Sequence, residues 1–231
     1  MRDGLALRFV EKSNEGKKQK DRALVMAESP KLAIYGGSFS PVHTGHVLAA
    51  RAFLSVTDAD KLIIMPARRP PHKSLDGMIS DSQRVDMCRL AFETDGQLCG
   101  KCEVSTFELE RDSVSYTVDT IEHFRFLGYE DISLLVGTDM LLSFERWYRF
   151  ADILSYVTLC YVDRSEDMRE RTRKHAEYLE SRYGARVIAI DADVFEVSSS
   201  EIRELIADGK SITGLVGEKV EEYIIKNGLY K

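Results

Sequence analysis

The stretch Tyr35-Gly36-Gly37-Ser38-Phe39-Ser40-Pro41-Val42-His43-Thr44-Gly45-His46 is the part of this 231-residue sequence from which the fold and the site are best predicted. An apolar run, residues 32–35, leads into it, and a helix-like run follows from residue 45. Strand, glycine turn and helix start thus occur in the order that anion sites use, because a helix N-terminus presents unpaired N–H groups and a positive dipole end. Gly36 and Gly37 let the backbone approach a ligand closely.

Two of the five histidines, His43 and His46, lie in this turn. They are one helical turn apart, so both imidazoles can face the same phosphate chain. Zinc binding is an alternative for such a pair, but no Cys, Asp or Glu stands beside them to complete a site. For the glycines the alternative is a tight turn between a core strand and a core helix. Taken together, the residues favour phosphate binding.

The composition is that of an ordinary globular protein, with 44% hydrophobic and 30% charged residues. A net charge of −6 argues against a general nucleic-acid surface, although a local basic pocket is compatible with it. No apolar run approaches the length of a membrane span, and the N-terminus lacks the apolar core of a signal peptide. We therefore expect a cytoplasmic protein.

The first thirty residues differ from the rest of the chain. Residues 11–22 are polar and lack apolar periodicity, which is typical of a flexible segment. We expect a flexible N-terminal extension over residues 1–30 and a single domain over residues 31–231. Cys99 and Cys102 form a CxxC pair, which fits a redox pair or half a zinc site, but no second pair completes such a site.

From residue 31 onward, strand-like and helix-like patterns alternate. The strands are short apolar runs, as in sheets that helices cover on both faces. We predict an α/β fold, a Rossmann-like parallel sheet with helices on both faces, and binding at the carboxyl ends of the strands. The expected strands are residues 32–35, 61–66, 102–107, 132–136, 157–162 and 186–190, and the expected helices are residues 45–55, 82–93, 118–127, 144–154, 167–183, 199–207 and 216–226.

Several motifs together resemble one enzyme superfamily. The stretch from Gly36 to His46 resembles the signature loop of the nucleotidyltransferases that carry a HxGH motif. Val197-Ser198-Ser199-Ser200-Glu201-Ile202-Arg203 resembles their second signature, Ser-Ser-Thr-x-Ile-Arg. The resemblance covers the chain from about residue 31 and implies the nucleotidyltransferase type of sheet. Stretches similar to the nicotinate-nucleotide adenylyltransferases of this superfamily are Pro66-Ala67-Arg68-Arg69-Pro70-Pro71-His72-Lys73, Ser115-Tyr116-Thr117 with Asp119-Thr120, and Val136-Gly137-Thr138-Asp139 with Phe144 and Trp147.

The resemblance implies transfer of AMP from ATP to nicotinate mononucleotide, which gives deamido-NAD and pyrophosphate in NAD biosynthesis. It makes His43 and His46 the catalytic residues, bound to the α- and β-phosphate oxygens, with His46 stabilising the transition state. The implied ATP-binding residues are Gly36, Gly37, Ser38, Phe39, His43 and His46, together with Ser199, Ser200 and Arg203, which would hold the leaving pyrophosphate.

The resemblance also implies a site for nicotinate mononucleotide. The helix start at Tyr116 and Thr117 would turn its N–H groups to the pyridine carboxylate. Trp147 would stack on the ring, and Asp139 would accept hydrogen bonds from the ribose. Lys73, in a basic proline-containing loop, and Arg164, near the mononucleotide phosphate, complete the set. Structural alternatives are an N-cap at Ser115 or Thr117, a core position for Trp147 and a solvated loop at residues 68–74.

The acceptor phosphate is already an anion, so the reaction needs no general base. Mg²⁺ is the implied cofactor; it enters with ATP and is held mostly by water and phosphates, so no protein ligand is expected to stand out. The expected partners are the two small-molecule substrates, with no nucleic acid and no membrane, and homo-oligomerisation stays open.

Two positions depart from the family pattern. Ser40 stands where the family usually has Asp, which keeps a hydrogen-bonding oxygen but removes a charge, and Ser200 stands where Thr is usual. Alternative functions are transfer to nicotinamide mononucleotide or pantetheine phosphate, or a nucleotide-binding sensor that has lost turnover. Ser40 is the only residue that favours the sensor.

Overall fold

The computed structural model describes residues 29–68, 79–112, 114–162, 166–192 and 197–231. They contain one sheet of six parallel strands in the spatial order β3-β2-β1-β4-β5-β6. The parallel α/β fold that the alternating pattern predicts is thereby confirmed. The strands are β1 (Lys31–Gly37), β2 (Lys61–Pro66), β3 (Cys102–Val104), β4 (Asp131–Gly137), β5 (Val157–Val162) and β6 (Arg186–Ile190).

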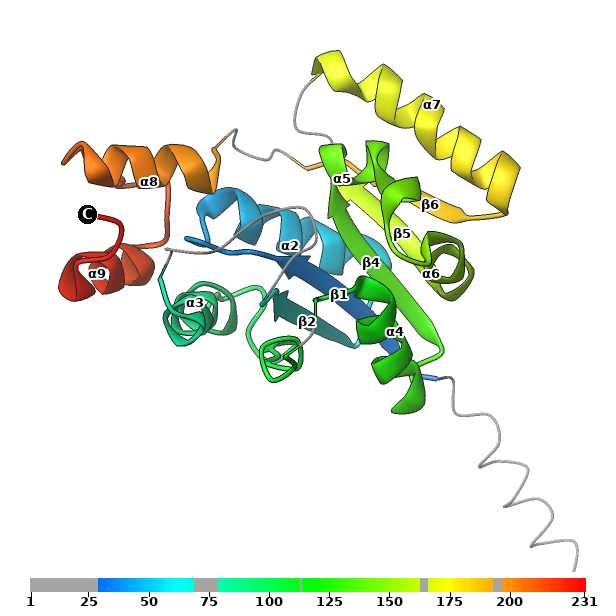
Figure 1. Cartoon of the computed structure of the whole chain (residues 1–231), viewed down its shortest axis with the longest axis horizontal. Helices are drawn as coiled ribbons and strands as arrows, with labels where there is room; N and C mark the ends of the chain where they lie inside the picture. The colour runs from blue at the N-terminus through cyan, green and yellow to red at the C-terminus, as the bar shows by residue number, and fades with distance from the viewer. Residues whose placement is uncertain (1–28, 69–78, 113, 163–165, 193–196) are drawn as a thin grey trace, which may run out of the picture.

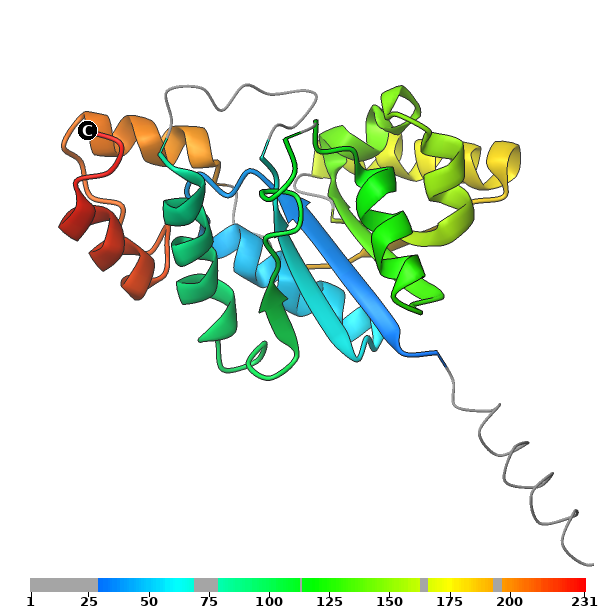
Figure 2. The ribbon, with the colours of Figure 1, turned by 60° about the horizontal axis from the view of Figure 1, so that its bottom comes forward.

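Helices cover both faces of this sheet (Figures 1 and 2). Because side chains alternate along a strand, Ala33 and Tyr35 enter one core, and Leu32 and Ile34 enter the other. None of the described helices is long and apolar enough to cross a membrane. The first core includes α2 (Thr44–Thr57), α3 (Asp81–Cys88), the π-helical turn η1 (Arg89–Glu93), α8 (Ser199–Ala207) and α9 (Glu218–Asn227); the second includes α4 (Thr117–Phe126), α5 (Thr138–Leu142), the 3₁₀ turn η2 (Phe144–Arg146), α6 (Phe150–Tyr156) and α7 (Glu166–Tyr183).

The strand order places β1 beside β4, and the chain leaves these two strands toward opposite faces of the sheet. β1 leads into α2 on the first core, whereas β4 leads into α5 on the second. In open α/β sheets such a switch point leaves a crevice at the carboxyl ends of the strands, where ligands bind. The glycine turn after β1 and Gly137 at the end of β4 both lie there.

The region after β4 differs from the prediction of one helix over residues 144–154. The structure has the extra helix α5, then η2 and α6 separated by a break at Trp147, Tyr148 and Arg149. Trp147 has extended backbone, and Arg149 is left-handed with φ of 54°. The Arg149 guanidinium is held by Glu122 of α4 at 2.8 Å and by Asp152 at 2.6 Å. This break depends on a partner far away in the sequence, so helical periodicity could not reveal it.

The buried side chain of Arg84 ties α3 to the ends of two strands. It is 1% exposed; its Nη1 donates to the Ser38 carbonyl at 2.7 Å, and its Nη2 donates to the Ala67 carbonyl at 2.8 Å. Nη2 also pairs with the carboxylate of Asp81. Because a buried cation is stable only when it is paired and hydrogen-bonded, these contacts fix the segments after β1 and β2 in one arrangement.

Replacing Arg84 with Met should lower the free energy of unfolding by about 2–4 kcal/mol, because the Ser38 and Ala67 carbonyl groups lose a buried, charged donor. Arg84→Lys should recover only part of this loss, since an ammonium group lacks the planar fork that reaches both carbonyls. Urea denaturation measures both variants. Arg173→Met on α7 removes an exposed, ion-paired arginine as a control. An equal loss in Arg84→Met and Arg173→Met would contradict the prediction.

Candidate active site

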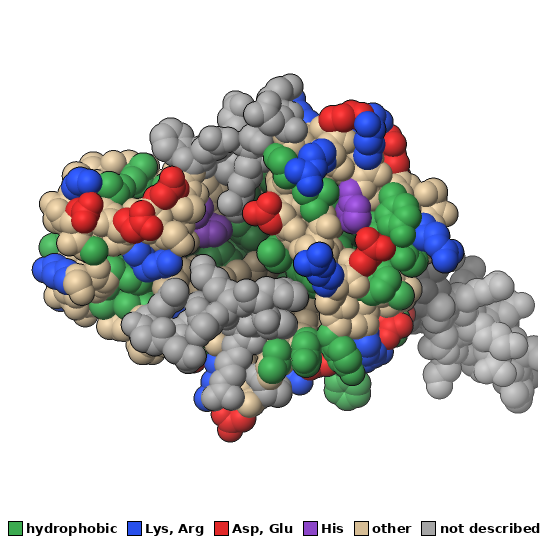
Figure 3. All heavy atoms as spheres, turned by 45° about the horizontal axis from the view of Figure 1, so that its top comes forward, with side chains coloured by type: hydrophobic (Ala, Val, Ile, Leu, Met, Phe, Trp, Pro, Cys, Tyr) green, Lys and Arg blue, Asp and Glu red, His purple; other side chains and the backbone are tan. Residues whose placement is uncertain are grey.

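A cavity of about 770 Å³ opens at the switch point, a volume within the range of small-molecule sites. Figure 3 shows this face of the molecule hollowed near its middle, with histidine at one rim. The walls come from the ends of β1, β2 and β4, from the start of α4, and from the break between η2 and α6. The lining residues on which the following paragraphs depend are Gly36, Gly37, Ser38, His46, Met65, Glu108, Ser115, Tyr116, Thr117, Thr120, Asp139, Arg146, Trp147 and Tyr148.

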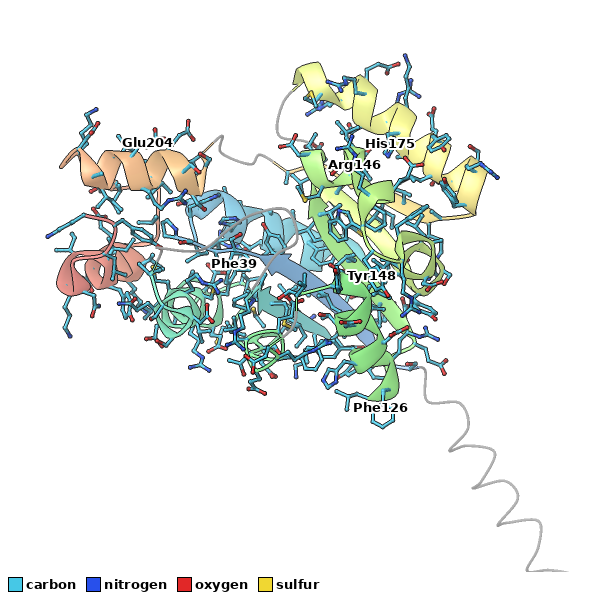
Figure 4. The ribbon with its side chains drawn as sticks, viewed as in Figure 1. Phe39, Phe126, Arg146, Tyr148, His175 and Glu204 are labelled. Atoms are coloured by element: carbon cyan, nitrogen blue, oxygen red, sulfur yellow. The ribbon has the colours of Figure 1, made fainter. Side chains whose placement is uncertain are left out.

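The two loop glycines have different roles. A Cβ on Gly37 would lie 2.8 Å from the Phe39 ring, so close packing requires glycine there. A Cβ on Gly36 would meet nothing closer than the Met65 carbonyl at 3.9 Å, so at this exposed, cavity-lining position glycine leaves room for a ligand. Phe39, labelled in Figure 4, is predicted to bind ATP, but it is 1% exposed and belongs to the first core. Its side chain shapes the loop and is not among the lining residues.

His43 and His46 stack on each other, with ring centroids 3.6 Å apart and planes inclined by 29°. His43 is the buried N-cap of α2, whereas His46 lines the cavity. The backbone N–H of His43 donates to Nδ1 of His46 at 3.2 Å, which assigns the proton of a neutral His46 imidazole to Nε2. His46 can therefore donate a hydrogen bond from Nε2 to an anion, while His43 supports its ring.

α4 begins at the cavity without a side-chain cap. Its N-cap residue is Tyr116, whose side chain makes no capping hydrogen bond. The alternative of an N-cap at Ser115 or Thr117 is therefore wrong. The Ser115 hydroxyl instead accepts the N–H of Arg68 at 3.2 Å and is hydrogen-bonded to Glu108. The first N–H groups of α4 thus have no capping side chain at a point where the helix start lines the cavity.

Glu108 is a buried carboxyl group beside this helix start. It is 8% exposed, and its Oε1 accepts the hydroxyl of Thr120 on α4 at 2.7 Å. Burial raises the pKa of the Glu108 carboxyl, and the hydrogen bonds from Thr120 and Ser115 offset only part of that rise. Glu108 therefore ties the first turns of α4 to the segment after β3.

The wall formed by the break between η2 and α6 is aromatic. The Trp147 indole stacks on Phe144, with centroids 4.8 Å apart, and its buried Nε1 has no hydrogen-bond partner among the described residues. Tyr148 lies against Tyr116, with centroids 4.6 Å apart, so this wall meets the start of α4. Arg146, which Figure 4 labels, also lines the cavity, and within the described ranges no carboxylate forms an ion pair with it.

Asp139 lies where the motif after β4 places it. It is an exposed residue in the first turn of α5, and its position lines the cavity. Tyr116, Thr117, Asp139 and Trp147, predicted to bind one substrate, are thus brought together around one cavity with Gly36, Gly37, Ser38 and His46. Their contacts with substrates stay predictions.

The second signature contacts the loop after β1 from the side of α8. Ser199 Oγ donates to the Pro41 carbonyl at 2.9 Å. Arg203 donates from Nη1 to the Ser40 carbonyl at 2.7 Å and from Nη2 to Ser200 Oγ at 3.0 Å. Ser199 and Arg203 hold the loop and Ser200 contacts Arg203; none of the three is among the residues that line the described cavity. Their binding of pyrophosphate stays a prediction.

Some predicted features fall outside the described residues. They include Lys73, Arg164 and residues 1–28 of the expected N-terminal extension. The CxxC cysteines are described: both are free thiols, Cys99 exposed and Cys102 partly buried. Burial raises the pKa of the Cys102 thiol to about 12, which makes it a weak nucleophile at neutral pH.

Sequence reasoning missed several residues that build the site. Arg146 and Tyr148 flank the predicted Trp147, but a continuous helix would have turned them away from it. Glu108 lies in a loop without periodicity, and no pattern marks it. For Arg84 the only signal is an arginine within an amphipathic helix, which ordinarily indicates an exposed face.

The fold and the site together define an α/β nucleotidyltransferase, and comparison with known proteins agrees. The family model described as Cytidylyltransferase-like matches residues 34–205. A probable nicotinate-nucleotide adenylyltransferase of Caldicellulosiruptor saccharolyticus is 35% identical over 201 residues, which cover 87% of this chain and 99% of that protein. Another, from Thermotoga sp. strain RQ2, is 36% identical over 196 residues, covering 84% and 94%. The chain belongs to the nicotinate-nucleotide adenylyltransferases of the cytidylyltransferase-like family.

Solved structures share the fold. The nicotinic acid mononucleotide adenylyltransferase of Plasmodium falciparum, complexed with NaAD, superimposes with a TM-score of 0.71 at 19% identity and covers 87% of this chain and 97% of that one. The same protein complexed with APC gives a TM-score of 0.69. The nucleotidyltransferase type of sheet, which the sequence resemblance implies, is confirmed.

Glu108→Gln should make the stability of the protein less dependent on pH. A carboxyl group whose pKa is raised by folding contributes stability below its unfolded pKa, near 4.3, and loses that contribution as the pH rises through its folded pKa. The melting temperature of Glu108→Gln relative to the wild type should therefore rise between about pH 4 and neutral pH. Thermal unfolding across this range measures it, with the exposed Glu110→Gln as control. A flat or falling difference would refute the prediction.

Proposed function

We propose that the cavity binds ATP and nicotinate mononucleotide side by side and transfers AMP to the mononucleotide, giving deamido-NAD and pyrophosphate. The observation that carries this proposal is a single cavity that joins a histidine-bearing helix start on one face of the sheet to an uncapped helix start and an aromatic wall on the other. The first supplies donors for a phosphate chain. The second supplies donors and a stacking surface for a carboxylated ring.

In the proposed reaction an oxygen of the acceptor phosphate attacks the α-phosphorus of ATP. A new P–O bond forms as the bond to the bridging α–β oxygen breaks, and the electron pair leaves with pyrophosphate. The nucleophile is already an anion, so catalysis consists of positioning and charge stabilisation. Nε2–H of His46 donates to a phosphate oxygen on which charge develops, and the Nδ1 bond to the His43 N–H keeps the imidazole in that tautomer.

Selection of the acid over the amide follows from the start of α4. A helix that begins without a side-chain cap leaves N–H donors at the positive end of its dipole. A carboxylate accepts hydrogen bonds from these N–H groups and brings a negative charge to the positive end of the dipole. A neutral carboxamide can accept a hydrogen bond but brings no charge. Ser115 and Thr120 direct their hydroxyls to Glu108, so neither hydroxyl competes with the backbone N–H groups of the helix start for the ligand.

Mg²⁺ fits the site as an ion that comes with the triphosphate. The described residues contain no cluster of three or more His, Cys, Asp or Glu side chains that could hold a metal, so water and phosphate oxygens would supply most of its ligands. When bound, the ion neutralises charge that develops on the phosphates. We place the enzyme in the cytoplasm.

The first test is pyrophosphate release with ATP and Mg²⁺, with nicotinate mononucleotide and nicotinamide mononucleotide offered in parallel. We expect kcat/KM to favour the acid by at least about tenfold, because charged hydrogen bonds are each stronger than neutral ones by roughly 1 kcal/mol or more. Equal rates would refute the role of the α4 start. No release with either acceptor would overturn the proposed reaction and favour pantetheine phosphate or a sensor.

His46→Asn should lower kcat by roughly 10²–10³, as expected when a donor to developing charge is removed. The asparagine side-chain oxygen can still accept the His43 N–H, so the start of α2 should persist. Circular dichroism and thermal unfolding check this. His175→Asn, on α7 away from the lining residues, is the matched control and should keep normal turnover. Unchanged kcat in His46→Asn would remove His46 from the mechanism.

A further inference from the structure

The second-to-last residue of the chain contacts the middle of the signature loop. The hydroxyl of Tyr230 lies 3.2 Å from Oγ of Ser40, across 190 positions of sequence. Ser40 is fully buried, and it is the residue at which this chain departs from the Asp usual in its family. The contact therefore joins the C-terminus to the one unusual position of the loop that carries His43 and His46.

The end of α9 directs Tyr230 to this place. Gly228 is left-handed, with φ of 60°, and the N–H of Leu229 bonds to the Ile224 carbonyl at 3.1 Å, which reverses the chain. Leu229 is 6% exposed, and Tyr230 packs against the same core as Phe39. Burial raises the pKa of the Tyr230 hydroxyl to about 12, so it keeps its proton at neutral pH.

Arginine side chains contact the loop at Ser38 and at Ser40 itself. The Ser38 carbonyl accepts from Arg84 at 2.7 Å, and the Ser40 carbonyl accepts from Arg203 at 2.7 Å. His43, the N-cap of α2, follows three residues later. The backbone of Ser40 is thus held by a guanidinium group and its side chain by Tyr230.

The uncharged pair of Ser40 and Tyr230 also affects how much of the positive charge of Arg203 is left to attract phosphates. An aspartate at position 40 would place a carboxylate beside Arg203, whereas the Ser40 and Tyr230 hydroxyls add no charge. In the part of the chain that the structure describes, no carboxylate forms an ion pair with Arg203. Its positive charge thus remains uncompensated next to the loop predicted to bind the phosphate chain.

We propose that Tyr230 is a positioning residue for the reaction: through Ser40 it fixes the signature loop, and with it the histidines and Arg203, in the geometry that binds and releases pyrophosphate. This proposal rests on the proposed function, since it assigns Tyr230 to the phosphate half of the same site. Tyr230 itself is not among the lining residues, so it acts through Ser40.

Tyr230→Phe removes only the hydroxyl, and the chain offers a matched control. Tyr223 of α9 donates its hydroxyl to Asp86 at 2.8 Å, away from the loop, so Tyr223→Phe removes a comparable bond. We expect Tyr230→Phe to lower kcat roughly threefold to tenfold, the size of one lost hydrogen bond, with KM for nicotinate mononucleotide within about twofold. Tyr223→Phe should keep kcat, and both should melt at similar temperatures. Equal kcat in the two variants would overturn the proposal.

Ser40→Ala, alone and combined with Tyr230→Phe, tests whether Tyr230 acts through Ser40. If Tyr230 acts through Ser40, kcat of Tyr230→Phe with Ser40→Ala should fall no further than in the worse single variant. Multiplicative losses would show that the two residues act separately and would also overturn the proposal.

A titration with pyrophosphate alone keeps the two proposals distinct. Calorimetry should show several-fold weaker binding of pyrophosphate to Tyr230→Phe than to the wild type or Tyr223→Phe. If the wild type released no pyrophosphate from ATP with nicotinate mononucleotide, the proposed function would fail, and this titration would still decide the role of Tyr230. Equal affinities in all three proteins would refute it.

Discussion

The backbone carbonyl groups of the loop after β1 impose the constraint on which the rest of the site depends. A backbone that leaves the ladder of a sheet at its carboxyl edge must find other donors for these groups. Here the donors come from three places: Arg84 of α3 for Ser38, Arg203 of α8 for Ser40, and the Ser199 hydroxyl for Pro41. The loop therefore has its shape only when both flanking helices are packed, which couples the site to the first core.

This constraint explains how an acidic protein can hold positive charge beside the loop that is predicted to bind phosphates. The net charge of −6 is spread over the whole chain, but the loop is bordered by guanidinium groups that cannot lose their protons. Arg84 shares its charge with Asp81, whereas no ion pair neutralises Arg203 among the described residues. Arg84 thus mainly stabilises the structure of the loop. Arg203 stabilises it as well and also leaves a positive charge beside it.

Much of the fold could be predicted from the sequence because local rules determine it. β2, β5 and β6 have the predicted bounds, and α8 begins at Ser199, as predicted, where Ser198 and Glu201 form a capping box. The site was predictable where motifs are contiguous, as at His43 and His46. It was not predictable where tertiary contacts decide: the break at Trp147 depends on Arg149 reaching Glu122, and the role of Ser115 depends on Glu108, which lies outside any periodic element.

The two halves of the cavity differ in whether the protein itself satisfies their hydrogen-bonding groups. On the phosphate side, hydrogen bonds to its own residues already satisfy the loop, so a phosphate chain adds to a formed structure. On the α4 side, the helix start lacks a capping side chain, and the nearby acid, Glu108, is occupied by the hydroxyls of Ser115 and Thr120. A ligand carboxylate would supply the hydrogen-bond acceptor that no capping side chain provides at this helix start. A ligand that completes the structure only in its anionic form would be selected by that charge, so under the proposed function acid selection would depend on the uncapped start of α4.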